Sequence, residues 1–433
     1  MRRPQPRYPA SARHLRWSII RRRHLLLRGG GLAALLAVIG PGILAGLSDD
    51  DPAGITTYSI LGAEYGYQLL WVLVLSTAAL IIFHQIAVRV GVVTGKGLMT
   101  LIDERWGPKV ARFVLVSLVV ANLGTLCAEF AGVSAASELL GFGNQYVVVP
   151  VVAIAISALV LKGSFKRVEH VLLLLSSIFV AYIAAGFLAG PDWGQAAKGM
   201  VVPNLPLNRD AILIAVATVG TTLAPWGLTF IQSYAVDKRL EIKDLRFERI
   251  DVVVGAVLTG VIGLFVVVAC AATIHASGGS IDTASDAAKA LEPLAGGLAS
   301  KLFGLGFFGA ALLAAAIVPL ATAYSVSELF DKRHDLNDRF QDARLFYLSY
   351  IAAMALAAGV ILIPGVPLIP VLFLTQALNA ILLLLVLPFL WILSQDSELM
   401  GDLAISGPAR IVSGIALTLI AFSVLALAGF TLL

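Results

Sequence analysis

Residues 40–57 read Gly40-Pro-Gly-Ile-Leu-Ala-Gly-Leu-Ser-Asp-Asp-Asp-Pro-Ala-Gly-Ile-Thr-Thr57, and this stretch decides how the whole chain is interpreted. An apolar run meets three consecutive carboxylates that end at Asp51, and a Pro-x-Gly break at Pro52 and Gly54 follows at once. A helix that crosses a bilayer tolerates such a break only where the freed backbone groups line a polar cavity or bind a ligand. The stretch therefore predicts a cation site inside a membrane protein.

The composition places the chain in the class of polytopic membrane proteins. Its 433 residues are 59% hydrophobic and only 13% charged, and the mean hydropathy is +0.90. A soluble domain of this size needs far more charge to cover its surface. At roughly 20 residues per span plus loops, the length leaves room for about ten to twelve helices. Cys127 and Cys270 fall in apolar runs, which argues against a disulfide framework or a zinc cluster.

Apolar runs predict eleven transmembrane helices in one membrane domain, residues 31–433. The runs are Gly31–Tyr65, Leu69–Val92, Val110–Leu139, Tyr146–Leu161, Val168–Leu188, Ala211–Ala235, Val252–Ile274, Leu302–Leu329, Leu345–Ile363, Leu368–Leu393 and Ile411–Leu432. The first, third, sixth and eighth runs are longer than a bilayer needs, so these helices are expected to tilt or break.

Positive charges are distributed as expected for a cytoplasmic N-terminus. Nine arginines precede Gly29 and no acid occurs before Asp49, so residues 1–30 are predicted to form a basic cytoplasmic tail. A transit peptide or a nucleic-acid arm would be basic as well, but the tail is the simpler interpretation, and no nucleic-acid partner is expected. The predicted inner loops carry many bases and the outer loops few. We expect an integral protein of a bacterial cytoplasmic (inner) membrane.

The sixth run contains a second Pro-x-Gly break, in Thr218-Val-Gly-Thr-Thr-Leu-Ala-Pro-Trp-Gly-Leu-Thr-Phe230. If two five-helix repeats occupy about residues 31–190 and 208–394, with an extra helix at about 411–432, each break falls in the first helix of its repeat. Matched interrupted helices indicate the midplane site of an inverted-repeat transporter. Glycine and proline also merely kink membrane helices. Two matched breaks, one of them with three acids, favour a functional site.

Oxygen atoms are the ligands that these breaks can supply. Asp51 provides the charge, with Asp50 beside it, and unwound carbonyls near Gly54 and from Thr221 to Ala224 are further candidates. Oxygen-only coordination suits a hard cation such as Mg²⁺, Mn²⁺ or Ca²⁺. An anionic substrate would be repelled, because no intramembrane lysine or arginine offsets the acids.

Polar residues in two other predicted helices extend the candidate site. Glu129 is either a supporting acid or proton site, or a protonated residue bonded to a neighbouring helix. Gln376 and Asn379 either complete the coordination shell or only join helices through hydrogen bonds. No mid-span histidine pair indicates an enzyme. No cofactor is expected, since the metal is the transported substrate.

Several motifs in the sequence resemble those of a known family. They are Asp51-Pro-Ala-Gly54 with Gly66-Tyr-Gln-Leu-Leu-Trp71, Val92-Val-Thr-Gly-Lys96, Ala128-Glu129, Leu387-Pro-Phe389 and Leu399-Met-Gly401. In these motifs the chain resembles the natural resistance-associated macrophage protein (NRAMP) transporters of divalent metals. The resemblance implies an all-α membrane protein with a leucine-transporter-type inverted repeat of five plus five helices, in which helices 1 and 6 are discontinuous.

The departures from the family pattern concern the ligands. The family's first-helix motif is Asp-Pro-Gly-Asn, so Gly54 replaces an asparagine ligand. In the sixth helix Ala224 replaces a methionine and Trp226 a histidine, and in the third helix Leu126 replaces an aspartate of the proton route. Loss of the soft sulfur ligand is expected to weaken discrimination against hard, hydrated ions. The chain looks more like the NRAMP-related magnesium transporters, in which proton coupling is lost.

The sequence therefore predicts a secondary transporter of Mg²⁺ or Mn²⁺ that works by alternating access, with weak or absent proton coupling. The predicted metal-site residues are Asp51, Gly54, Thr221, Ala224, Glu129, Gln376 and Asp50. The alternatives are a proton-coupled importer of Mn²⁺ or Fe²⁺, and a cation-coupled symporter of an organic solute on the same fold. We expect a monomer whose partners are the metal ion and the lipid bilayer.

Overall fold

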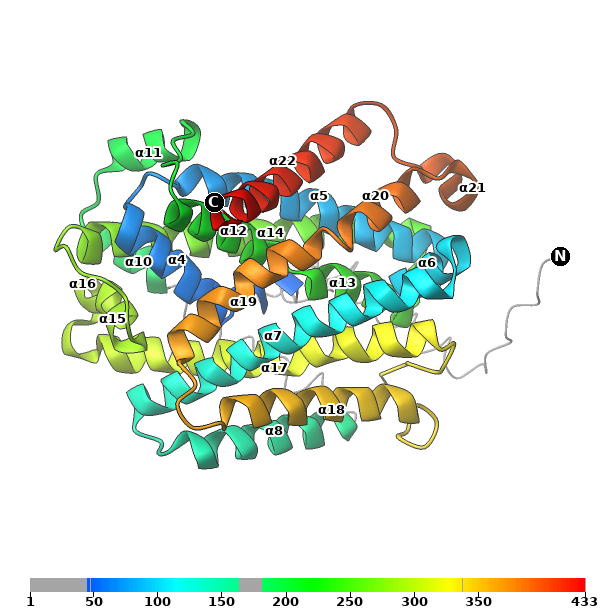
Figure 1. The fold of residues 1–433 in the computed structure, drawn as a ribbon, viewed down its shortest axis with the longest axis horizontal. Helices are drawn as coiled ribbons and strands as arrows, with labels where there is room; N and C mark the ends of the chain where they lie inside the picture. Colours follow the sequence, from blue (N-terminus) through cyan, green and yellow to red (C-terminus); the bar gives the residue numbers. More distant parts are fainter. Residues whose placement is uncertain (1–44, 47, 163–180, 337, 433) are drawn as a thin grey trace, which may run out of the picture.

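The computed structural model describes residues 45–46, 48–162, 181–336 and 338–432, and every regular element among them is helical. Figure 1 shows most of the long helices lying roughly along a common direction in one bundle. The longer helices are α4 (Pro52–Tyr65), α5 (Leu70–Thr94), α7 (Pro108–Leu140), α8 (Gln145–Leu161), α12 (Arg209–Thr222), α13 (Pro225–Asp237), α14 (Leu245–Cys270), α17 (Ala299–Leu329), α18 (Arg344–Ile361), α19 (Leu368–Leu383) and α22 (Gly407–Leu432).

Shorter helical segments complete the described chain. They are α6 (Leu98–Trp106), α10 (Ala181–Leu188), α11 (Trp193–Val201), η2 (Ile242–Asp244), η3 (Ala271–His275), α15 (Ala284–Ala288), η4 (Lys289–Leu291), α16 (Glu292–Ala295), η5 (Gly296–Leu298), α20 (Leu387–Gln395), α21 (Ser397–Met400) and η6 (Gly401–Leu403). Local capping explains several starts; for example, the Asn208 side chain accepts a hydrogen bond from the Ala211 amide at the start of α12.

Eight segments in the described part of the chain are long and apolar enough to cross a membrane, and α8 is a shorter apolar helix of 17 residues. Together, the eight segments and α8 correspond to predicted spans two to four and six to eleven. Residues 31–44 of the first predicted span and 168–180 of the fifth lie outside the described residues, as does the predicted basic tail, residues 1–30. The helices α4 and α10 are the described parts of those two spans.

Both predicted breaks interrupt their helices. The first span restarts as α4 at Pro52, and the sixth is divided between α12 and α13 at Leu223 and Ala224. The tenth span is also divided, between α19 and α20, which the sequence analysis did not predict. The same physical signal was present there, because Pro388 lacks the N–H that the Leu384 carbonyl would accept in a continuous helix.

Proline alone does not end every helix in this bundle. Pro319 lies inside α17, which is one continuous helix of 31 residues. The hydroxyl of Tyr350 donates a hydrogen bond to the carbonyl of Ala316, just before the proline, at 3.2 Å. The carbonyl that loses its helical donor to Pro319 is that of Ala315, so this hydrogen bond ties α18 to α17 one residue beyond the disturbed carbonyl.

The helix α4 lies at the centre of the bundle and contacts α7, α12, α14 and α19. Its residues from Pro52 to Ala63 are all buried. Glycines allow close approach around it: Gly132 of α7 packs directly against the Pro52 ring, and Gly220 of α12 packs against the backbone of Gln376 in α19. A side chain at either glycine would push these helices apart. The fold therefore brings the first break, α7, α12 and α19 together.

Candidate cation site between two broken helices

Asp51 is held at the first break by local hydrogen bonding. It is the N-cap residue of α4, with extended backbone angles of φ −72° and ψ 171°. Its Oδ1 atom accepts a hydrogen bond from the Gly54 amide at 2.6 Å. Pro52 occupies the first helical position, where a missing N–H costs nothing. The result is a carboxylate fixed at the start of a buried helix, only 3% exposed.

The second break exposes neutral oxygens. The backbone turns extended at Ala224, with φ −73° and ψ 142°, and α13 begins at Pro225. Because Pro225 has no N–H, the carbonyl of Thr221 has no helical donor four residues later. The Thr221 hydroxyl is buried and has no hydrogen-bond partner among the residues that the structure describes. Thr221 thus offers two oxygens to any cation at this level.

The two breaks meet at Gly54. A methyl group placed on Gly54 would lie 3.2 Å from Asp51 Oδ1 and 3.3 Å from Thr221 Oγ1. One turn further along α4, the Tyr58 hydroxyl forms a hydrogen bond of 2.9 Å with the hydroxyl of Thr222, the residue after Thr221, and this bond ties α4 to α12. The predicted pairing of Asp51 and Gly54 with Thr221 is therefore present in the geometry, with the carboxylate on one side and the hydroxyl on the other.

Glu129 joins the same region from α7. The contact between Gly132 and Pro52 turns the preceding turn of α7, which carries Glu129, toward the first break. The Glu129 carboxyl lies beside that of Asp51. Glu129 is fully buried, and neither of its carboxyl oxygens has a hydrogen-bond partner within the described parts of the chain. Two adjacent buried carboxyls repel unless a proton or a cation lies between them.

Gln376 and Asn379 form a network on the side of α19 that faces α7. The Asn379 amide donates to Thr125 Oγ1 at 2.8 Å and to Gln376 Oε1 at 3.1 Å, and the Gln376 amide donates to Thr375 Oγ1 at 3.3 Å. Both polar groups of Gln376 are thereby engaged. The Asn379 Oδ1 atom is buried without a described partner. Asn379 therefore offers the freer oxygen of the two.

The other two acids of the first stretch are equally buried but lie differently. Asp49 and Asp50 are each 1% exposed, and their carboxylate oxygens have no hydrogen-bond partner among the described residues. Asp49 Oδ1 and His84 Nε2 both lie within 4 Å of the position of a methyl group on Gly227. Asp49 thus faces α5 and α13, whereas Asp51 faces Gly54 and α12.

His84 was not singled out by sequence, although it interrupts an apolar run in the second span. A pair of histidines in one span would have been a sequence signal, whereas the titratable group near His84 is Asp49, on another segment. Within the described residues, no three His, Cys, Asp or Glu side chains converge closely enough to hold a metal ion. A cation at Gly54 would accordingly be held by few carboxylates and by neutral oxygens.

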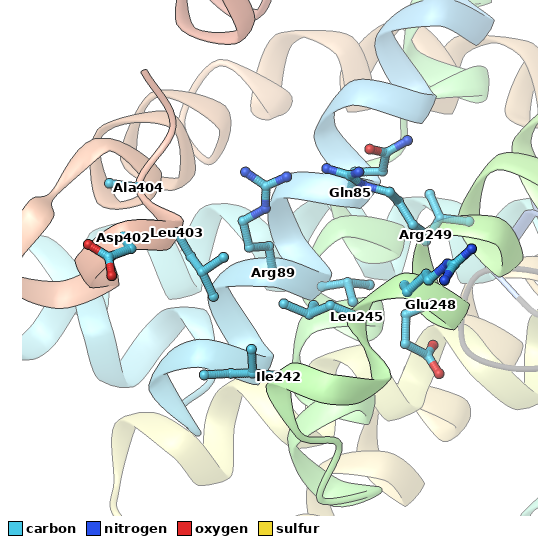
Figure 2. Close-up of a pocket in the computed structure, with 12 residues that line it drawn as sticks. Gln85, Arg89, Ile242, Leu245, Glu248, Arg249, Asp402, Leu403 and Ala404 are labelled. Carbon is cyan, nitrogen blue, oxygen red and sulfur yellow. The ribbon is translucent and has the colours of Figure 1, made fainter. Parts of the chain in front are cut away.

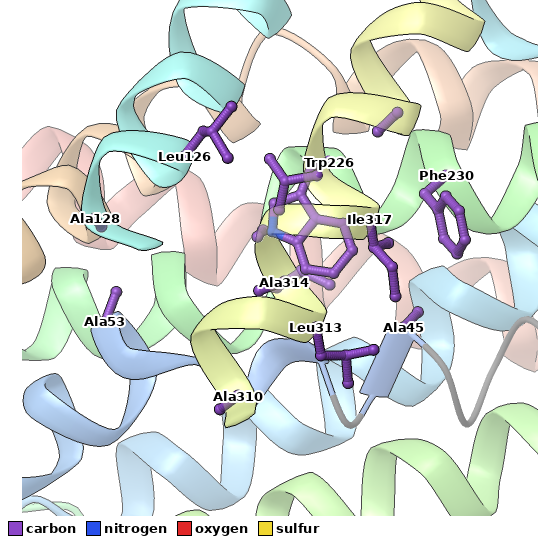
Figure 3. Close-up of a cluster of buried hydrophobic side chains, with 14 of the residues drawn as sticks. Ala45, Ala53, Leu126, Ala128, Trp226, Phe230, Ala310, Leu313, Ala314 and Ile317 are labelled. Carbon is purple, nitrogen blue, oxygen red and sulfur yellow. The ribbon is translucent and has the colours of Figure 1, made fainter. Parts of the chain in front are cut away.

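Hydrophobic side chains occupy the two positions where the resemblance implies a proton route. Leu126 and Trp226 are 0% and 1% exposed. Figure 3 shows them on α7 and α13 among apolar side chains that include Ala314 and Ile317 of α17. None of these four side chains can accept or release a proton.

Sequence comparison matches this chain to known transporters. Residues 42–429 match the family model described as natural resistance-associated macrophage protein-like. The chain is 28% identical over 403 residues to the divalent metal cation transporter MntH of Burkholderia ambifaria, covering 91% of this chain and 88% of that protein.

Structure comparison identifies solved structures with a similar fold. A manganese transporter of Eremococcus coleocola, in complex with an aromatic bis-isothiourea substituted compound, matches with a TM-score of 0.75 at 18% identity, covering 90% of this chain and 86% of that chain. MhsT in complex with L-phenylalanine matches with a TM-score of 0.59 at 15% identity, covering 89% of this chain and 98% of that chain. At these identities the likenesses show the fold alone, and the predicted leucine-transporter-type fold is confirmed.

Proposed function

Because the chain belongs to the natural resistance-associated macrophage protein family, we propose that it is a secondary transporter that moves Mg²⁺ or Mn²⁺ across a membrane by alternating access. Members of this family are transporters of divalent metal ions and not enzymes. The metal is the substrate, and no cofactor is required. Alternating access uses hinges, and the breaks before α4 and between α12 and α13 provide them.

The meeting of the two breaks at Gly54 supports this proposal most directly. Asp51 Oδ1 and the unpartnered Thr221 hydroxyl flank the same small space at the centre of the bundle. Burying a carboxylate beside further unpaired oxygens is costly unless a cation compensates the charge. We assign Asp51 as the principal ligand, with backbone oxygens near Gly54 and from Thr221 to Ala224.

Glu129, Gln376 and Asp50 are assigned supporting roles. Glu129 adds negative charge beside Asp51. Gln376 orients Asn379, whose free oxygen is the more direct candidate ligand. The unpartnered carboxylate of Asp50 can reach a hydrated ion through water. A magnesium ion usually keeps several waters, which suits a site with few protein ligands.

The side chains at the second break bear on which ion is carried and on whether protons are carried with it. Ala224 supplies no sulfur, and oxygen donors alone do not select a soft ion over a hard one. Transport without protons is expected because Trp226 and Leu126 are apolar and buried. A pH-sensitive dye trapped in vesicles tests this: Mg²⁺ uptake should leave the internal pH unchanged. Acidification that depends on Mg²⁺ would favour the proton-coupled alternative.

Uptake into proteoliposomes tests the assignment of Asp51. Asp51→Asn should lower the initial rate of Mg²⁺ or Mn²⁺ uptake by about a hundredfold, equivalent to about 2.7 kcal/mol of ion binding. Asp286→Asn removes an acid from the exposed start of α15 and serves as the control, which should transport normally. Near-normal uptake by the Asp51 variant would contradict the assignment. Saturable uptake of an organic solute, without metal uptake, would favour the symporter alternative.

We further infer that the protein is a monomer in a bacterial cytoplasmic membrane, with its N-terminus on the cytoplasmic side. We also propose that the two five-helix repeats have the bounds given in the sequence analysis. The loop before α11 then faces outward and the loop before α14 inward. An impermeant thiol reagent applied to whole cells should label Asp192→Cys and leave Lys243→Cys unlabelled. The reverse pattern would overturn the orientation. Light scattering of the purified protein tests the monomer.

A further inference from the structure

A cavity lined by three arginines lies outside the candidate cation site. It forms where the second half of α5 meets the first turns of α14 and the segment around η6, and its volume is about 390 Å³ (Figure 2). Its charged residues are Arg89, Arg246, Glu248, Arg249 and Asp402. None of them belongs to the metal-site residues assigned above. We call this cavity the arginine pocket.

The three arginines of the arginine pocket lie close together, and none of them has an ion-pair partner among the described residues. Arg89 is half-buried on α5, and Arg249 of α14 lies near enough to repel it. Figure 2 shows their guanidinium groups side by side, with the Gln85 amide next to them. No described acid forms an ion pair with Arg89, Arg246 or Arg249. The carboxylates of Glu248 and Asp402 point away from the Arg89 guanidinium (Figure 2).

Two neighbouring guanidinium groups have the geometry that binds phosphate. Each presents a planar fork of N–H donors, and two forks can hold one tetrahedral anion with several charge-assisted hydrogen bonds. The Gln85 amide adds a neutral donor. Binding an anion would also remove the repulsion between Arg89 and Arg249, which nothing else in the described structure does.

The surroundings of the pocket are apolar in a way that suits a lipid. Val88, Leu245 and Val252 line it together with the arginines. Ile242 of η2 and Ile250 of α14 are 58% and 51% exposed. The pocket lies at the end of a membrane-spanning helix, on the side where the positive-inside rule places the cytoplasm. Basic pockets between transmembrane helices on that side can bind anionic headgroups.

We propose that the arginine pocket binds a phosphate-bearing anion, supplied by the headgroup of an anionic membrane lipid or by phosphate free in the cytoplasm. Arg89 and Arg249 hold the phosphate group, and Arg246 adds charge at the rim. The apolar residues of α14 would cover the first part of an acyl chain if the source is a lipid.

Native mass spectrometry of the full-length protein tests the lipid source. The protein is mixed with equal amounts of phosphatidylglycerol and phosphatidylcholine, and the bound lipid molecules are counted. Three proteins are compared: wild type, the double variant Arg89→Gln with Arg249→Gln, and the single variant Arg112→Gln. Wild type should bind phosphatidylglycerol in preference to phosphatidylcholine. In the double variant the ratio of bound phosphatidylglycerol to bound phosphatidylcholine should fall about tenfold, as expected for a lost charge-assisted hydrogen bond. Arg112 is an exposed arginine on α7 outside the pocket, so its variant should behave as wild type.

A titration with inorganic phosphate tests the soluble source. In phosphatidylcholine nanodiscs, phosphate should raise the unfolding temperature of wild type and not that of the double variant if the ligand is free phosphate. Leu403→Trp fills the pocket while keeping every arginine, and it should lose the same response, which separates pocket occupancy from general loss of charge. If wild type and all variants give equal responses in both experiments, the proposal is wrong.

Discussion

The two helix breaks share the pattern Pro-x-Gly and differ in charge. At the first, Asp51 caps α4 with its carboxylate, which accepts a hydrogen bond from the Gly54 amide at 2.6 Å. At the second, the methyl group of Ala224 cannot accept a hydrogen bond at the start of α13, and the Gly227 amide donates instead to the Ala224 carbonyl at 3.2 Å. The first break therefore supplies negative charge, and the second supplies neutral oxygens.

This difference limits the negative charge that the two breaks bring together. A second carboxylate at the second break would repel Asp51 and raise the cost of the empty state. Neutral oxygens add ligands without that repulsion. The other buried acids near the first break are Asp49 and Asp50, which precede Asp51 in the chain, and Glu129, which reaches Asp51 from α7.

The largest effect is expected from closing the space between the breaks. In Gly54→Ala, the new methyl group would lie 2.6 Å from the Asp49 carbonyl oxygen and would occupy the space between Asp51 and Thr221. We expect metal affinity to fall by about a hundredfold, or 2.7 kcal/mol. Isothermal titration checks this, with Gly429→Ala as the control because nothing lies near that glycine. Unchanged affinity in Gly54→Ala would mean that the ion binds elsewhere.

A softer ligand at the second break should change ion preference. Ala224→Met adds a thioether at the start of α13, next to the oxygens of the site. The ratio of Mn²⁺ to Mg²⁺ affinity should rise by about tenfold, since sulfur favours the softer ion. Competition uptake of the two ions in proteoliposomes measures the ratio. If the ratio stays constant, the side chain at position 224 does not face the metal.

Two adjacent threonines separate ligand binding from structural support. Thr221→Val removes a hydroxyl that has no described partner, so it should weaken metal binding by roughly fivefold and leave stability unchanged. Thr222→Val removes the hydroxyl bonded to Tyr58 and should cost about 1 kcal/mol of unfolding free energy. Metal titration and thermal unfolding of both variants measure the two effects. If Thr221→Val lowered stability and Thr222→Val weakened metal binding, the proposed role of Thr221 as a ligand would be wrong.

An acid at a helix start outside the membrane should matter least. A hydrogen bond from Lys289 to Asp286, with further ones from Thr283, lowers the pKa of Asp286 from 3.8 to about 2. Its charge therefore stabilises α15 above pH 3.8, and this contribution disappears as the pH falls toward 2. Because the group lies at the surface of the protein, where solvent screens its charge, we expect only a few tenths of a kcal/mol. Amide exchange of α15 in wild type and Asp286→Asn should differ at pH 5 and converge near pH 2.

The sequence was most informative where a local rule decides the structure. The breaks at Pro52 and Pro225 follow from the missing N–H and from flanking acids or glycine, and both are present. The break before Pro388 was missed because a proline alone is ambiguous: Pro319 lies in an unbroken helix. The difference depends on neighbouring helices, which sequence periodicity does not reveal.

Contacts between helices were the least accessible to sequence reasoning. Glu129 was recognised as an unusual acid, but its place beside Asp51 depends on the close packing of Gly132 on Pro52. The approach of Asp49 to His84 likewise requires the fold. The choice between Gln376 and Asn379 as ligand needed the hydrogen bonds of α19.

Anomalous X-ray diffraction from crystals grown with Mn²⁺ locates the ion directly. We predict a single strong peak in the central region, within coordination distance of the Asp51 carboxylate and beside Thr221. A peak between Asp49 and His84 without one at Asp51, or no peak at either place in crystals of protein that transports Mn²⁺, would contradict the central claim that the two breaks form the metal site.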